Sequence, residues 1–94
     1  MAQLTRRITL SAASDIEIER GIVLPPGSYE GIERQAGLEL IDRTRWSEPE
    51  YKIEITSDQL ARMGADSARQ LLSTEYDVTK FVRWGQLTVT RPVH

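Results

Sequence analysis

The stretch YKIEITSDQLARMGADSARQLLS, residues 51–73, changes its hydrophobic period part of the way along. Tyr51, Ile53 and Ile55 alternate with polar residues, which is the pattern of a strand with one face on the core and the other in water. Beyond residue 56 the apolar side chains recur at helical spacing instead. A strand that runs directly into a helix predicts a mixed α+β protein.

The second half of this stretch predicts one packed helix over residues 57–73. Its apolar side chains fall within an arc of about 140° when each residue turns the helix by about 100°. Thr56 or Ser57 can cap its start by accepting a backbone N–H. Gly64 could end a short first helix or lie inside a continuous one. Because Gly64 lies within the apolar arc, we expect one continuous helix with its backbone close to the sheet.

Alternation with period two also occurs elsewhere in the chain. The apolar pairs that mark these strands are Ile8 with Leu10, Ile16 with Ile18, Leu38 with Leu40, and Leu87 with Val89. We therefore expect a small, strongly bent antiparallel sheet of five or six strands, open or closed into a barrel, with the one helix packed across it. The predicted core is Ile8, Leu10, Ile16, Ile18, Leu40, Ile53, Ile55, Leu60, Leu71, Leu72, Leu87 and Val89.

Residues 76–85 fit two structures. Val78, Val82 and Trp84 alternate as in a strand, but the segment also has helical spacing, with Asp77 as a cap and Gly85 as a stop. We expect a short helix or turn that leads into the last strand, and the strand remains an alternative.

The segment LPPGSYEG, residues 24–31, has the densest cluster of turn residues. It does not fit a phosphate-binding loop, because its glycines have the wrong spacing and Ile32 and Glu33 stand where lysine and a hydroxyl residue are required. Pro26 and Gly27 instead predict a type II turn between two strands. The sequence leaves open whether Tyr29 faces the core or a partner.

Composition restricts the class of protein. The chain has 94 residues, which suits one domain over residues 1–94, and its net charge is −2 with basic ends and an acidic middle. It contains no cysteine, and no apolar run is long enough to cross a bilayer. We expect a small soluble cytoplasmic protein with no membrane partner.

Candidate catalytic groups are few. The only histidine is His94, and no serine is followed three residues later by lysine. Glu17 and Glu19 share one face of a strand, but that face is the one expected in water. An enzyme built on these carboxylates is the weakest hypothesis. We expect no enzyme activity, no cofactor and no metal site.

Two clusters combine arginine with an aromatic residue. Arg43 and Arg45 lie beside Trp46, and Arg83 lies beside Trp84. Such residues are enriched at protein–protein hot spots, although a partly buried core or rim position would also explain both tryptophans. They indicate a non-catalytic binding protein, such as an adaptor, inhibitor or regulatory subunit, that acts through a protein surface.

Two further hypotheses concern partners. Nucleic-acid binding would require the basic residues near both chain ends to converge on one face, namely Arg6, Arg7, Lys80, Arg83 and Arg91. The net acidic charge makes this the alternative to protein binding. An edge strand in so small a sheet could also pair with a second copy, so that a homodimer is a further possibility.

Overall fold

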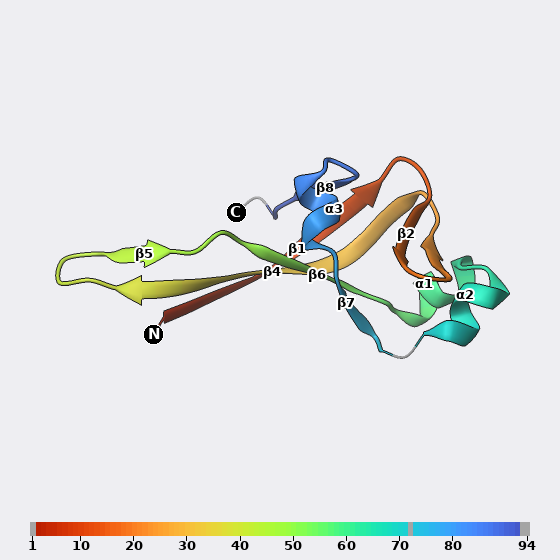
Figure 1. The fold of residues 1–94 in the computed structure, drawn as a ribbon, viewed down its shortest axis with the longest axis horizontal. Helices are drawn as coiled ribbons and strands as arrows, with labels where there is room; N and C mark the ends of the chain where they lie inside the picture. Colours follow the sequence, from red (N-terminus) through yellow and green to blue (C-terminus); the bar gives the residue numbers. More distant parts are fainter. Residues whose placement is uncertain (1, 72, 93–94) are drawn as a thin grey trace.

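The computed structural model describes residues 2–71 and 73–92 and consists mainly of strands (Figure 1). Its elements are β1 (Ala2–Ala12), β2 (Ile16–Glu19), β3 (Ile22–Leu24), β4 (Gly27–Glu39), β5 (Thr44–Trp46), β6 (Glu50–Glu54), α1 (Ser57–Arg62), α2 (Ala65–Gln70), β7 (Glu75–Asp77), α3 (Thr79–Arg83) and β8 (Leu87–Thr90). The mixed α+β composition agrees with the change of period in residues 51–73.

The strands form one antiparallel six-stranded sheet and one separate pair. The order in the main sheet is β7-β6-β4-β1-β8, and β5 pairs with the far end of β4. Strands β2 and β3 pair only with each other. Within the described residues, β7 and β8 do not pair, so the sheet is open and does not close into a barrel.

Strand β4 is the centre of this arrangement. It pairs with β1 from Ala12↔Gly27 to Ala2↔Gly37, and β6 pairs with its middle. Beyond β6 it continues outward with β5, and we call residues 36–47 the arm (Figure 1). The radius of gyration is 14.9 Å, against about 12.4 Å expected for a compact chain of this length. The arm therefore makes the molecule long, with a greatest extent of 52 Å.

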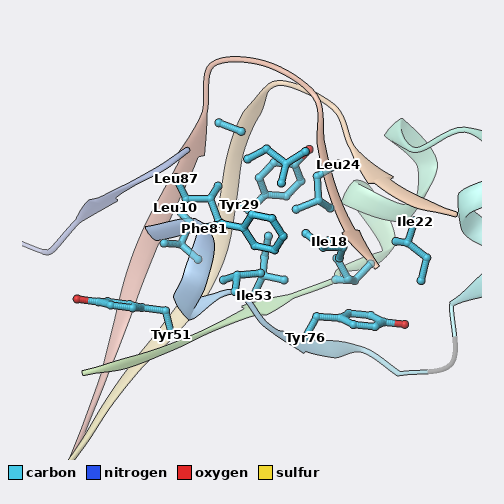
Figure 2. Close-up of a cluster of buried hydrophobic side chains, with 14 of the residues drawn as sticks. Leu10, Ile18, Ile22, Leu24, Tyr29, Tyr51, Ile53, Tyr76, Phe81 and Leu87 are labelled. Carbon is cyan, nitrogen blue, oxygen red and sulfur yellow. The ribbon is translucent and has the colours of Figure 1, made fainter. Parts of the chain in front are cut away.

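The core lies on one face of the sheet, at the end away from the arm (Figure 2). Leu10, Ile53 and Val78 are fully buried there, and Tyr29 is 1% exposed. The hydroxyl of Tyr29 donates a hydrogen bond to the carbonyl of Pro25, which answers the question of where this tyrosine faces.

Most of the predicted core is confirmed, and two members are wrong. Leu40 is 42% exposed because it lies in the arm, and Leu60 is 41% exposed. Leu71 and Val89 are partly buried against the core, and Leu72 lies outside the described residues. The residues confirmed as buried are Ile8, Leu10, Ile16, Ile18, Ile53, Ile55 and Leu87.

The single helix predicted over residues 57–73 is two short helices, α1 and α2. Thr56 caps α1 as expected, in a reciprocal pair of hydrogen bonds with Gln59. The break follows from Met63, which has an extended backbone and a buried side chain, although it lay off the apolar arc. Gly64 then begins α2, and it is exposed with open space where a Cβ would lie. The expected close approach of Gly64 to the sheet was wrong.

Residues 76–85 contain the short helix α3, which leads into β8 as expected, whereas the alternating strand over Val78, Val82 and Trp84 is not formed and β7 ends before it, at Asp77. Asp77 accepts a hydrogen bond from the backbone N–H of Thr79 at 2.9 Å, and Gly85 follows α3 with a φ of +78°. The stop at Gly85 was therefore interpreted correctly, whereas the N-cap residue is Val78 and Asp77 lies one position before it. The strand and the helix both fit in this part of the chain because the strand has three residues and the helix has five.

The corner at residues 25–27 is confirmed, but its turn type is not. Pro25 and Pro26 lie between β3 and β4 and carry the chain from the small sheet into the main one. Gly27 has a φ of +144°, whereas the corresponding position of a type II turn has about +80°. This residue already belongs to β4, where it pairs with Ala12.

The contrast between core and arm predicts that replacing isoleucine by alanine changes the free energy of unfolding by different amounts at two positions. Ile53→Ala removes a side chain that is fully buried and should lower the free energy of unfolding by about 2–5 kcal/mol. Ile41→Ala changes a residue of the arm that is fully exposed and should change it by no more than about 0.5 kcal/mol. Urea denaturation followed by circular dichroism measures both. Equal losses would contradict the placement of these two residues.

Candidate functional site

The arm carries an unusual concentration of exposed apolar side chains. Leu38 is 57% exposed, Leu40 42%, Ile41 107% and Trp46 41%. We call these four residues the arm patch. Of the six large apolar residues that are exposed in the described part of the chain, four lie within nine positions of each other, and the other two are Leu60 and Trp84. Single exposed apolar residues are ordinary, but several on one short hairpin are typical of an interaction surface.

The arm is a hydrogen-bonded hairpin with a defined backbone. At its tip the backbone N–H of Leu40 donates to the carbonyl of Arg43 at 2.7 Å. At its base the backbone N–H of Ser47 donates to the carbonyl of Ala36 at 2.8 Å, and the Ser47 hydroxyl accepts from the Ala36 N–H at 3.0 Å. The side chains of the arm patch are thus presented on a backbone that already has partners.

A shallow hollow of about 300 Å³ lies on the arm between β4 and β5. Its lining comes from Ala36, Gly37, Leu38, Arg45, Trp46 and Ser47. Gly37 has no side chain, and the space where its Cβ would lie is bordered by the Trp46 ring at 2.9 Å. A glycine at this position therefore lets the indole ring approach β4 closely.

The first arginine–tryptophan cluster lies on the arm. Arg43, Arg45 and Trp46 are all exposed, Arg43 in the tip loop and the other two in β5. Successive residues of a strand point to opposite faces, so Arg45 and Trp46 do not share one. Arg45 faces the same side as Leu38, its partner in the β4–β5 register.

The second cluster lies on α3. The Trp84 ring packs edge-to-face on Phe81 with centroids 5.9 Å apart, and the Lys80 ammonium lies 5.8 Å from the Trp84 centroid. Arg83 pairs with Glu48 at 3.2 Å. Glu48 follows the arm, so this ion pair links α3 to the base of the arm, while the two tryptophans remain on separate elements.

The basic residues considered for nucleic-acid binding are placed differently from what that hypothesis requires. Arg6 and Arg7 are consecutive in β1 and point to opposite faces of the sheet. Most of these cations also have partners: Arg6 and Arg91 lie against Glu33, Arg7 pairs with Glu54 and Arg83 with Glu48. A single basic face built from all five residues is not formed.

Glu33 is a buried carboxylate that sequence analysis did not identify. It lies in the middle of β4 and is 3% exposed. The Arg91 guanidinium donates to both carboxylate oxygens, in one case at 3.1 Å, and the Arg6 guanidinium lies 4.0 Å away. The hydrogen bonds from Arg91 lower the pKa of Glu33 below its ordinary value, more than burial raises it. In the sequence, the only signal was an acidic residue on the face of β4 that also carries Tyr29 and Gly31.

Tyr51 completes this cluster from β6. Its hydroxyl accepts a hydrogen bond from Arg91 at 3.4 Å and interacts with Glu33, while burial raises the pKa of the Tyr51 phenol. The cluster thus joins β1, β4, β6 and the segment after β8. Its ionisable groups satisfy one another, which is the arrangement of a structural ion pair rather than of a reactive group.

Other candidate chemistry stays on the surface. Glu17 and Glu19 are exposed on β2, on the face expected to be in water. Over the described residues, no group of three histidine, cysteine or acidic side chains is placed to hold a metal ion. The helices of the same residues are all too short to span a bilayer.

Comparisons with protein-family models, with curated proteins and with solved structures found no match to this chain. The arm patch and the charged groups around β1 are the features of this chain that bear on its function.

The Glu33 cluster predicts a stability that depends on pH. Because the pKa of Glu33 is lowered in the folded state, its carboxylate stabilises the fold above its unfolded pKa, and this stability is lost as the pH falls through the lowered value. Glu33→Gln should lower the free energy of unfolding by about 2 kcal/mol at pH 7, and the difference from wild type should shrink below about pH 4.5.

Urea titrations at pH 7, 5 and 3 measure this difference. Glu54→Gln is the matched control, because its partner Arg7 is 74% exposed, and it should cost less than about 1 kcal/mol. A difference for Glu33→Gln that is the same at all three pH values would contradict a role for the ionised carboxylate.

Proposed function

We propose that this protein is a non-catalytic binding protein that contacts a protein partner through the arm patch. The observation that carries the proposal is the group of four exposed apolar side chains on a hairpin that projects from the folded body (Figure 1). Adaptor, inhibitor and regulatory subunit are the classes of protein that this surface suits.

Burial of the arm patch against a partner would supply the driving force for binding. Full burial of Ile41, which is fully exposed, would contribute about 1.5–3 kcal/mol, and burial of the half-exposed Leu38 and Leu40 would contribute less for each side chain. The ordered backbone of the arm reduces the conformational entropy that binding would have to remove. Trp46 adds a large ring on the face of the hairpin opposite Leu38, and tryptophan is among the residues most enriched at hot spots.

The arm patch is favoured over the Trp84 cluster for two reasons. Trp84 already packs on Phe81 and Lys80, so part of its surface and its cation–π capacity are used within the chain. Arg83 is paired with Glu48, whereas the arm presents four exposed apolar side chains, with Leu38 and Trp46 on opposite faces of the hairpin. We therefore place the principal contact on the arm, and Arg83 and Trp84 at its margin or outside it.

Site-specific photo-cross-linking tests the proposal. A photoreactive phenylalanine analogue at Ile41 should give a discrete protein adduct in native lysate, because Ile41 lies at the exposed tip of the patch. The same analogue at Glu17, which is exposed on β2, is the matched control and should not. Excess unlabelled chain should compete for the Ile41 adduct, and mass spectrometry identifies the cross-linked protein.

Two substitutions then separate the surfaces. Trp46→Ser in the cross-linking chain should reduce the Ile41 adduct about tenfold, and Trp84→Ser should leave it within about twofold. An adduct that consists of two copies of this chain would assign the patch to self-association instead. Equal labelling from Ile41 and Glu17, or no competition by unlabelled chain, would exclude the arm as a specific binding surface.

A further inference from the structure

The outer edge of β1 lacks a strand along much of its length. β4 pairs with β1 from Ala2 to Ala12 on one side, but β8 pairs with it only from Thr9 to Ala12 on the other. In the described part of the chain, no strand pairs with the second edge of residues 2–8. Backbone N–H and C=O groups that point outward along such an edge are a template for a further strand.

Charged side chains surround this open edge. A hollow of about 650 Å³ adjoins it, lined by Thr5, Arg6 and Arg7 of β1 and by Arg91 and Pro92, and this volume is within the range of ligand sites. Arg6 and Arg7 point to opposite faces of the sheet. Because both line the hollow, it lies at the edge of the sheet rather than over one face.

The arginines of the hollow outnumber the carboxylates that neutralise them. Glu33 receives both hydrogen bonds from Arg91, so that Arg6, at 4.0 Å, lies beyond hydrogen-bond distance of the same carboxylate. Arg7 makes one hydrogen bond to Glu54 at 3.1 Å and is 74% exposed. Three guanidiniums thus lie near two carboxylates. The N–H groups of Arg6 and Arg7 that face the hollow can therefore donate hydrogen bonds to a further anion.

We propose that the edge of β1 over residues 2–8 binds an extended acidic peptide by strand addition. Residues directly opposite each other in an antiparallel pair share a face. A bound strand would therefore place one acidic residue beside Arg7 and the next beside Arg6, and an apolar residue two positions later beside the half-buried Leu4. The site recognises the pattern acidic-acidic-any-apolar. It is distinct from the arm patch and goes beyond the proposed function.

The same geometry argues against two other occupants. A second copy of β1 would bring its own Arg6 and Arg7 to the interface, and residues 2–12 contain no acid to place opposite them. A nucleic-acid backbone would leave the amide and carbonyl groups of the edge without strand partners. An acidic peptide satisfies both the charges and the backbone.

Fluorescence polarisation with a labelled peptide tests the proposal on the full chain. The probe VEETLTV places its two glutamates opposite Arg7 and Arg6 and its leucine opposite Leu4 when it runs antiparallel to β1. It should bind saturably, weaken as salt rises, and shift the backbone amide resonances of residues 3–8 in a two-dimensional NMR spectrum. The matched peptide VKKTLTV should bind at least about tenfold more weakly.

Charge-reversal variants provide the control. Arg7→Glu should weaken the glutamate peptide about tenfold and favour the lysine peptide, whereas Arg45→Glu on the arm changes the net charge equally and should alter neither. Arg7→Gln, which creates no new repulsion with Glu54, should give a smaller loss in the same direction, and thermal unfolding checks that each variant is folded.

Several results would overturn the site. These are no saturable binding of the peptide up to about 1 mM, equal losses for Arg7→Glu and Arg45→Glu, or resonance shifts confined to residues outside β1. Tighter binding of a single-stranded oligonucleotide with the same dependence on Arg7 would assign the hollow to nucleic acid instead. None of these measurements involves the residues of the arm patch. A negative result here would therefore overturn the peptide site and leave the proposed function to be tested separately by cross-linking.

Discussion

The ion pair between the buried carboxylate of Glu33 and Arg91 is the interaction on which the arrangement of the sheet depends. The carboxylate lies in β4, and it holds the segment after β8 through Arg91, contacts β1 through Arg6 and interacts with Tyr51 of β6. A carboxylate that is 3% exposed would be costly to bury without such partners. The cluster therefore fixes where the chain runs after β8 and so shapes the hollow beside β1. It also occupies the guanidinium of Arg91, one of the basic residues near the chain ends.

The second constraint is the length of β4. Its 13 residues exceed what β6 can cover, so its outer part continues past the folded body and pairs with β5 alone on that side. Leu38 and Leu40 are carried outward with it and face solvent rather than the core. The arm patch and the open edge of β1 thus have one origin, because both arise where a long strand extends beyond its neighbours.

Sequence reasoning succeeded where local pattern and tertiary environment agree. Period-two alternation identified strands around Ile8, Ile16, Ile53 and Leu87, and the helix cap at Thr56 and the helix stop at Gly85 were interpreted correctly. It failed where the environment overrides the pattern. Leu40 has the alternation of a core strand, but alternation does not state how far along a strand the core extends. Ile41, which follows Leu40 directly and breaks the alternation, was the available signal that the strand had left the core.

The helix shows the same limit. Apolar spacing alone favoured one helix across Gly64, and the structure instead buries Met63 at a break between α1 and α2. The energetic difference between a continuous helix and two short ones is small, because a mid-helix glycine costs about 1 kcal/mol, so that burial of one methionine can decide it.

The sequence by itself determined the strand and helix periods, the caps and the corner at Pro26, since these depend on residues close together in the chain. It also determined that arginine and tryptophan would be adjacent in two places. Only the tertiary structure decided which of these residues face solvent and which carboxylate meets which arginine. The ion pair between Glu33 and Arg91 joins residues 58 positions apart, and in the described part of the chain the edge of β1 is open beyond Thr9 because β8 has only four residues. Contacts between distant segments depend on pairing register and strand length, which no local pattern encodes.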